Sequence, residues 1–249
     1  MNDGDFIKIS YEMALGDDKK VIATSDKKIA EDSGIYDEHF RYDDFVTIVG
    51  SDTFFKAINE SFLKAKQGEE YSVEVEPIDA FGVRDPKNIR VHTTRELQRQ
   101  NIDPEVGKEI TLNQRNGRII SVTPGRIMVD YNHRYAGKAV HFKYKVLESI
   151  ADETEKVKAI VTMNYMPNLS EFSFNLAKDT ISIQIPDNAK FDPVWFEAKF
   201  RIVNQVRKYI PELAVQIQEL YPKQEKPAEE PTESDKDKQT EVKGEKTEA

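Results

Sequence analysis

The alternation of apolar and polar residues is clearest in two stretches near opposite ends of the first 150 residues. In one stretch the apolar side chains occupy every second position, at Val140, Phe142, Tyr144 and Val146, with mostly polar residues between them. Residues 5–13 show the same period of two, which is typical of a strand with one buried face. The pattern therefore predicts two strands of one half-buried sheet.

Similar patterns predict the elements between these strands. Short alternating runs predict strands at 20–25, 45–49 and 71–75. Residues 53–66 carry an apolar stripe at helical spacing (Phe54, Ile58, Phe62 and Ala65), and Gly68 follows where a helix stop is expected. Residues 26–43 are polar and irregular, which predicts a long surface loop. The fold class is therefore α+β, with an antiparallel sheet wrapped on one helix.

Residues 85–128 form a small β module inserted between residues 1–84 and residues 129–150. Asn116-Gly117 lies between two apolar runs, a strong signal for a hairpin turn at these two residues. Pro124-Gly125 predicts a second turn.

Residues 151–222 are predicted to form a further α+β domain. Runs at 158–166, 170–176 and 179–185 are strand-like, and Asp192-Pro193 then gives an N-cap and a proline at the first helical position. The predicted order is β-β-β-α. Residues 223–249 lack aromatic residues and are rich in charge, so this tail is predicted to be disordered.

Composition limits the kinds of protein that fit this chain. It has no cysteine, which excludes disulfides, zinc-thiolate sites and a catalytic thiol. The first residues are acidic, and no apolar run approaches ~18 residues, so we expect a soluble cytoplasmic protein without a membrane partner. The net charge is −9, yet residues 85–128 hold 8 basic and 5 acidic side chains. That positive segment could attract an acidic partner, or it is an ordinary solvated surface.

Several aromatic residues from distant segments follow an order found in a known family. Tyr11, Phe45, Phe54-Phe55, Ala80-Phe81-Gly82 and Phe142, together with the loop Asp130-Tyr131-Asn132-His133-Arg134-Tyr135-Ala136-Gly137-Lys138, resemble the FKBP family of peptidyl-prolyl isomerases. The particular resemblance is to its SlyD-like and archaeal long-type branch. Members of that branch carry a domain inserted in the flap, and residues 151–222 resemble their extra C-terminal domain.

The resemblance implies an FKBP half-barrel and peptidyl-prolyl cis-trans isomerase activity. An apolar pocket favours the twisted, less polar transition state over the resonance-stabilised imide, which has a rotational barrier of ~18–20 kcal/mol. Replacing Tyr11 or Phe142 by alanine is expected to slow catalysis and to leave the fold mostly intact. Without the resemblance, the same residues are interpreted simply as hydrophobic core. The implied pocket residues are Tyr11, Ile22, Phe45, Phe54, Phe55, Ile58, Phe81 and Phe142.

Two positions depart from the family pattern. Ala23 stands where relatives usually have an aspartate, and Phe54-Phe55-Lys56-Ala57-Ile58 lacks the usual glycine before the helix. The alternative function is therefore a catalytically weakened holdase, which binds unfolded chains without efficient isomerisation.

The resemblance also implies that the insert is a chaperone module for unfolded or nascent polypeptides that contain proline. Its apolar residues either contact such clients or form the module's own core. The candidate client-binding residues are Val91, Leu97, Ile102 and Val106.

Nucleic acid or the ribosome is a third possible partner. Against this partner, no aromatic residue interleaves with the basic side chains. The candidate contacts are Arg90, Arg95, Arg99, Arg115, Arg118 and Arg126. No cofactor is expected, because nucleotide-binding glycine motifs are absent from the sequence. No metal is expected either, because His39, His92, His133 and His141 lack metal-ligand spacing.

Overall fold

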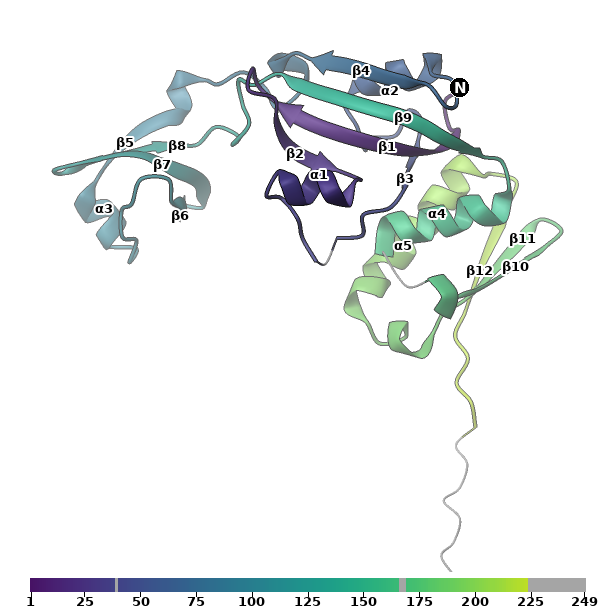
Figure 1. Cartoon of the computed structure of the whole chain (residues 1–249). Coiled ribbons are helices and arrows are strands. Elements are labelled where there is room, and N and C mark those ends of the chain that lie inside the picture. The colour runs from purple at the N-terminus through teal and green to yellow at the C-terminus, as the bar shows by residue number, and fades with distance from the viewer. Residues whose placement is uncertain (39, 166–168, 224–249) are drawn as a thin grey trace, which may run out of the picture.

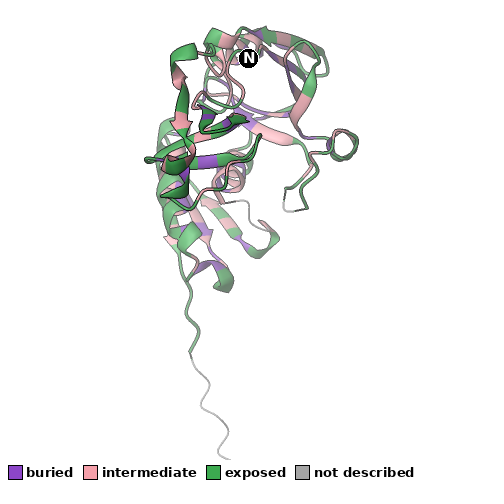
Figure 2. Ribbon diagram, turned by 90° about the vertical axis from the view of Figure 1, so that its left-hand side faces the viewer, coloured by how far each residue is buried: buried purple, intermediate pink, exposed green. Residues whose placement is uncertain are grey.

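A computed structural model describes residues 1–38, 40–165 and 169–223. Within these residues the strands form three sheets, and the buried apolar side chains form three clusters, two of which include residues of the first sheet. The inserted sheet and the C-terminal helices lie at opposite ends of the first sheet (Figure 1). Buried positions lie mainly on the strands and helices, whereas most loop positions are exposed or intermediate (Figure 2).

The first sheet is organised around β1 (Phe6–Leu15), which uses both of its edges. One edge pairs antiparallel with β9 (Val140–Ile150), and β4 (Glu70–Val75) pairs with the far side of β9. The other edge pairs first with β3 (Phe45–Ile48) and then with β2 (Lys20–Thr24). The α+β class and the alternation predicted for β1 and β9 are therefore confirmed.

Helix α2 (Lys56–Lys64) packs its apolar stripe on one face of this sheet. Ile58 and Phe62 have no exposed surface. The helix begins three residues later than the pattern predicted, because Phe55 has an extended backbone (φ −58°, ψ 153°). Phe54 and Phe55 therefore belong to the segment that leads into α2. A short helix η1 (Pro77–Asp79) follows β4.

The prediction of an irregular loop over 26–43 is wrong for its first part. Helix α1 (Lys27–Asp32) begins there, because the carboxylate of Asp26 accepts hydrogen bonds from the amides of Lys28 and Ile29. Ala30 is its buried contact. This N-cap is a local signal that the polar composition of the segment conceals.

The inserted sheet has the strand order β5–β8–β7–β6. These strands span Ile89–Thr93, Arg126–Asp130, Arg115–Thr123 and Glu109–Leu112. Helix α3 (Thr94–Gln98) follows β5, and the short helix η2 (Pro86–Asn88) precedes it. Because β8 continues to Asp130, the sheet extends two residues beyond the predicted boundary at 128.

The hairpin predicted at Asn116-Gly117 is displaced by three residues. The turn is at Asn113-Gln114, both of which have positive φ, at 52° and 61°. Asn116 and Gly117 lie inside β7 and pair with Thr111 and Ile110. A Cβ on Gly117 would lie 2.7 Å from Val129 Cγ1 and 2.8 Å from Tyr131 Cδ1. This glycine therefore allows close packing and does not form the turn.

The C-terminal part has the order α-β-β-α-β, so the predicted β-β-β-α order is wrong. Residues 158–166 do not form a strand: helix α4 (Glu153–Tyr165) covers all but the last of them, Met166, which lies outside the described residues. Its buried residues include Val157, Ile160 and Val161, which have helical spacing, and the Asp152 carboxylate accepts a hydrogen bond from the amide of Glu155. The many β-branched residues in this run suggested a strand, but burial of one helical face determines the structure.

The remaining C-terminal elements surround α5 (Pro193–Tyr209), whose predicted Asp192 N-cap is confirmed by a hydrogen bond from the amide of Val194. The third strand comes after this helix and pairs parallel with β11, as a crossover connection permits. The other elements are η3 (Leu169–Glu171), β10 (Ser173–Ala177), β11 (Thr180–Gln184), η4 (Asp187–Ala189) and β12 (Ala214–Gln218).

The first sheet and the C-terminal part share one hydrophobic core. Phe6, Ile48 and Ile150 of the first sheet belong to the same buried cluster as Trp195 and Ile202 of α5. None of the helices in the described residues is both long enough and apolar enough to cross a membrane. The tail predicted to be disordered lies outside the described residues, apart from Lys223.

The packing of Gly117 leads to the first prediction. We expect Gly117→Ala to lower the free energy of unfolding of the insert by about 1–3 kcal/mol, because the new methyl group overpacks the sheet. Gln114→Gly, at the true turn, should leave stability equal or higher, because glycine tolerates positive φ. Hydrogen exchange of the β6 and β7 amides measures both effects, and an unaffected Gly117→Ala would contradict the packing role.

Candidate functional site

The candidate site begins where the edge of β1 changes its pairing partner. β3 pairs with Phe6 to Ile9, and β2 pairs with Glu12 to Leu15, so Tyr11 lies between the two. The amide of Tyr11 donates to Ser25 Oγ at 3.0 Å. The carbonyl of Tyr11 accepts from Thr24 Oγ1 at 2.9 Å and from the amide of Ser25 at 3.1 Å. Thr24 and Ser25 thus satisfy the backbone of Tyr11 at this opening in the ladder.

Four aromatic rings from separate segments meet at this point. The ring of Tyr11 lies 5.3 Å from that of Phe45, 5.8 Å from that of Phe54 and 5.6 Å from that of Phe142. The rings of Phe54 and Phe142 are 4.9 Å apart, and those of Phe45 and Phe54 are 5.8 Å apart. The structure therefore brings together Tyr11, Phe45, Phe54 and Phe142, as the sequence predicted; we call them the inner ring cluster.

Burial differs sharply among the predicted pocket residues. Phe142 and Ile58 have no exposed surface, and Tyr11 is 9% exposed. Phe45 and Phe54 are half-buried, and so is Ile22, which packs against the same core. Phe142 and Ile58 therefore form the base of the cluster, while the half-buried side chains offer surface that a ligand can contact.

Asn59 fixes the segment that carries Phe54 and Phe55. Its Oδ1 accepts from the amide of Gly50 at 3.0 Å, and its Nδ2 donates to the carbonyls of Ser51 and Phe54 at 2.9 and 3.0 Å. Sequence reasoning missed this residue, because an asparagine on the first turn of a helix gives no signal of a distant partner. The N-cap residue Phe55 makes no side-chain hydrogen bond, so the bonds of Asn59 are what tie this segment to the first turn of α2.

The remaining two predicted residues form a second aromatic group. The rings of Phe55 and Phe81 are 5.2 Å apart, and Phe81 stacks on His133 at 4.8 Å and contacts Tyr135 at 5.1 Å. His133 and Tyr135 come from the loop before β9 and were not predicted as pocket residues. The available signal was that both lie in the loop 130–138, whose sequence is part of the family resemblance. We call these four residues the outer aromatic group.

The polar chemistry of the inner ring cluster comes from Tyr11. Burial raises the pKa of its hydroxyl, with a smaller contribution from the neighbouring Tyr42. The hydroxyl is therefore protonated at neutral pH and can donate a hydrogen bond. Ala23 lies opposite Met13 in the β1–β2 ladder and contributes only a methyl group there.

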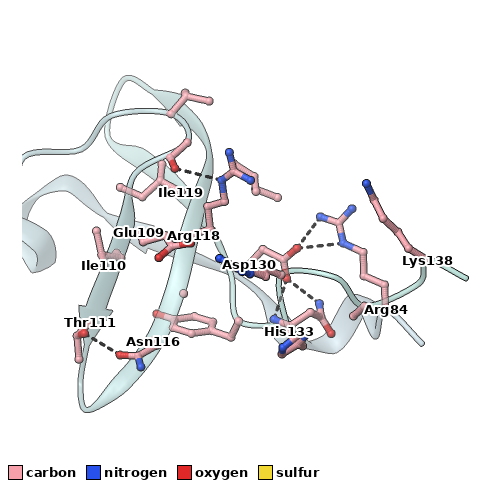
Figure 3. A pocket seen from close by; sticks show the side chains of 18 residues that line it. Arg84, Glu109, Ile110, Thr111, Asn116, Arg118, Ile119, Asp130, His133 and Lys138 are labelled. Carbon is pink, nitrogen blue, oxygen red and sulfur yellow. Dashed lines mark hydrogen bonds and ion pairs between the residues drawn. The ribbon is translucent and has the colours of Figure 1, made fainter. Parts of the chain in front are cut away.

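A separate hollow of about 850 Å³ lies between the inserted sheet and the loop that precedes β9 (Figure 3). Arg84 donates two hydrogen bonds to Asp130 Oδ2, at 3.0 and 2.6 Å. Burial acts to raise the pKa of Asp130, but hydrogen bonds from Asn132 and Arg84 outweigh it, so the pKa is lowered. Asp130 is thus ionised and compensates Arg84. Arg118, Arg134, Lys138 and His133 also line this hollow.

The histidines in the described residues make ordinary contacts. His92 Nδ1 is 3.0 Å from Glu96, and its Nε2 is 2.9 Å from the hydroxyl of Tyr131. His141 Nε2 is 3.1 Å from the carbonyl of Gly16. His39 lies outside the described residues. No cluster of three or more metal-ligating side chains occurs in the ranges that the structure describes.

The candidate client-binding residues of the insert have different surroundings. Val91 is 60% exposed and Val106 is 61% exposed, so both are accessible. Leu97 has no exposed surface and belongs to the core of the insert, so its prediction as a contact surface is wrong. Ile102 is partly buried against the same core.

Comparison with known protein families gives two matches. Residues 153–222 match the family model described as FKBP26_C-terminal, and residues 93–135 match the model described as FKBP26, IF domain. These matches cover the C-terminal part and most of the insert.

Among curated proteins, the chain is similar to several peptidyl-prolyl isomerases. It is 30% identical over 152 residues to a short-type peptidyl-prolyl cis-trans isomerase of Methanocaldococcus jannaschii, covering 61% of this chain and 96% of that protein. It is 30% identical to the FKBP-type 16 kDa peptidyl-prolyl cis-trans isomerase of Escherichia coli, covering 40% and 70%. It is 28% identical to the FKBP-type peptidyl-prolyl cis-trans isomerase SlyD of Helicobacter pylori, covering 46% and 64%.

The burial of Phe142 generates the second prediction. We expect Phe142→Ala to lower the free energy of unfolding by about 3–5 kcal/mol, because it leaves a cavity in the core. The expectation that this substitution leaves the fold intact does not agree with the burial of Phe142. Phe45→Ala is the matched control and should cost about 1–2 kcal/mol, because its ring is only partly buried. Urea unfolding measures both values, and equal costs would show that Phe142 is not the base of the cluster.

Proposed function

The chain belongs to the family of FKBP-type peptidyl-prolyl cis-trans isomerases, and we propose that its two aromatic groups together catalyse rotation about X-Pro bonds of unfolded polypeptides. The observation that supports this most directly is the inner ring cluster. Four rings from distant segments converge at the opening in the β1 edge, and two of them remain half-buried. A plain hydrophobic core has no need to leave such rings accessible.

The proposed mechanism uses desolvation and a single hydrogen-bond donor. A prolyl ring that enters against Phe45 and Phe54 leaves water, and the polarised, planar imide loses more solvation there than the twisted transition state does. The protonated hydroxyl of Tyr11 then donates to a carbonyl of the substrate. No covalent intermediate forms, and no proton leaves the enzyme.

The insert contributes a place where unfolded chain can bind. Val91 lies opposite Met128 in the β5–β8 ladder, and the two are 60% and 37% exposed. Exposed apolar neighbours on a sheet are suited to contact an unfolded segment. Holding the client on this surface raises the concentration of its X-Pro bonds near the inner ring cluster.

Refolding of a protein limited by proline isomerisation tests the catalytic proposal. Uncatalysed isomerisation takes tens to hundreds of seconds, so the slow refolding phase should accelerate in proportion to added enzyme. Phe81→Ala should lower kcat/KM by about tenfold, because it opens the outer aromatic group to water. Phe200→Ala is the matched control, because this ring is 72% exposed on α5 and lies outside both aromatic groups. A slow phase that the wild-type chain leaves unchanged would exclude catalysis.

A holdase with weakened catalysis is the second candidate, and Ala23 is the observation that favours it. If the missing carboxylate limits the rate, Ala23→Asp should raise kcat/KM by about tenfold or more, since a hydrogen bond to a charged group contributes about 1.5–3 kcal/mol and about 1.4 kcal/mol is a factor of ten in rate. Ala23→Asn is the matched control, because it has nearly the same shape without the charge. A wild-type chain that is already fast, and gains nothing from Ala23→Asp, rules out this candidate.

A further inference from the structure

We propose that the hollow between the inserted sheet and the loop before β9 binds acidic residues of the client, so that the protein prefers X-Pro bonds that have acidic neighbours. This inference rests on the proposed function and names the class of substrate. The hollow is drawn in Figure 3 and lies next to the outer aromatic group.

The charges that line the hollow are predominantly positive. They are Arg84, Arg118, Arg134 and Lys138 against Asp130 and Glu109, which leaves two excess positive charges in a chain with a net charge of −9. Asp130 is committed to Arg84. Such a local excess in an acidic protein concentrates anionic groups at one place.

Three of these cations remain available to a ligand. Arg118 faces Glu109 across the β6–β7 ladder, but its Nε donates to the carbonyl of Gly107 at 3.1 Å. The guanidinium of Arg134 lies 4.5 Å from the centre of the Tyr135 ring. Neither Arg118 nor Arg134 nor Lys138 forms an ion pair with a carboxylate of the described residues. Guanidinium groups without a carboxylate partner can bind a client carboxylate through two hydrogen bonds.

The hollow is joined to the candidate catalytic site by the loop that forms one of its walls. His133 lines the hollow and stacks on Phe81, and Arg134 covers the ring of Tyr135, which also contacts Phe81. In this proposal, a polypeptide with its proline in the inner ring cluster extends past Phe81 towards the hollow. The acidic residue should lie only a few positions away from the proline.

A polypeptide fits this hollow better than a nucleic acid does. The hollow is within the range of about 300–1,000 Å³ typical of ligand sites, enough for a few residues. Its aromatic ring, Tyr131, is covered by Arg115, whose guanidinium lies 4.6 Å from the ring centre, so that face cannot stack on a base. Base stacking is what single-strand binding proteins provide in addition to charge.

The test uses the full chain and short fluorescent peptides with one central X-Pro bond flanked by Glu, Gln or Lys. Binding is measured by anisotropy and isomerisation by NMR exchange, each at low and at high salt. At low salt the Glu peptide should bind about fivefold more tightly than the Gln peptide, and the Lys peptide should bind more weakly than both. High salt should reduce these differences, because it screens exposed charges.

The hollow variant is a triple variant that combines Arg118→Gln, Arg134→Gln and Lys138→Gln and so removes the three available cations. It should abolish the preference for Glu and leave binding of the Gln peptide unchanged. The matched control is Arg90→Gln, Arg95→Gln, Arg99→Gln, which removes the same charge from exposed positions of the insert outside the hollow and should keep the preference. Thermal unfolding checks that both variants are folded.

The outcomes separate this inference from the proposed function. A wild-type chain that isomerises all three peptides equally, or a preference that survives in the hollow variant, overturns the inference and leaves the isomerase intact. If the Glu peptide binds most tightly but no peptide is isomerised, the result supports the binding of acidic residues in the hollow. The same result contradicts the proposed isomerase activity. A single-stranded RNA that binds more tightly than the Glu peptide, and only in the presence of the three cations, assigns the hollow to nucleic acid and overturns the inference.

Discussion

The change of partner along the edge of β1 is the constraint on which the candidate site depends. β3 and β2 share that edge, and Tyr11 lies where neither forms its ladder bonds. Backbone groups left unpaired in a protein interior are costly, so Thr24 and Ser25 must bond the backbone of Tyr11 at this point. These bonds hold Tyr11 in place while the chain between β2 and β3 leaves the sheet. The gap affects only the strand pairing at the edge of β1. The core beneath Tyr11 stays packed and can support the inner ring cluster.

The insert is tied to the first sheet by hydrogen bonds between its two connecting segments. Asn132 Oδ1 accepts from the amide of Asp85, and its Nδ2 donates to the carbonyl of Asp85, both at 3.0 Å. The ion pair between Arg84 and Asp130 and the bond from the Gly137 amide to the carbonyl of Gly82 join the same two segments. Two chain crossings joined in this way restrict rotation of the insert relative to the first sheet. The outer aromatic group and the hollow both include residues of these two segments. The same bonds therefore fix the position of one relative to the other.

Sequence reasoning succeeded where a local pattern determined the structure. It failed where a contact with a distant residue determined the structure. The alternation in β1 and β9 and the Asp192 N-cap needed only nearby residues, and the structure confirms them. The role of Gly117 was predicted wrongly because it depends on close packing against the ring of Tyr131, 14 residues further along the chain. Rules for turns do not consider such a contact. In α4, β-branched residues favoured a strand, whereas packing on α5 selected the helix. The inner ring cluster was predicted only because a family resemblance supplied the long-range order that the chain alone does not reveal.

β1 also explains why the C-terminal part belongs to the same folded unit as the site. Phe6 and Ile7 are neighbours in the chain, yet Phe6 is buried in the core shared with α5, and Ile7 is buried in the core beneath Tyr11. Successive side chains of a strand point to opposite faces, so one strand serves two cores. Any loosening of α4 and α5 would remove the support from the first half of β1, and with it the register that places Tyr11 between β3 and β2. The C-terminal part, although far from the inner ring cluster, thus stabilises the strand on which that cluster is built.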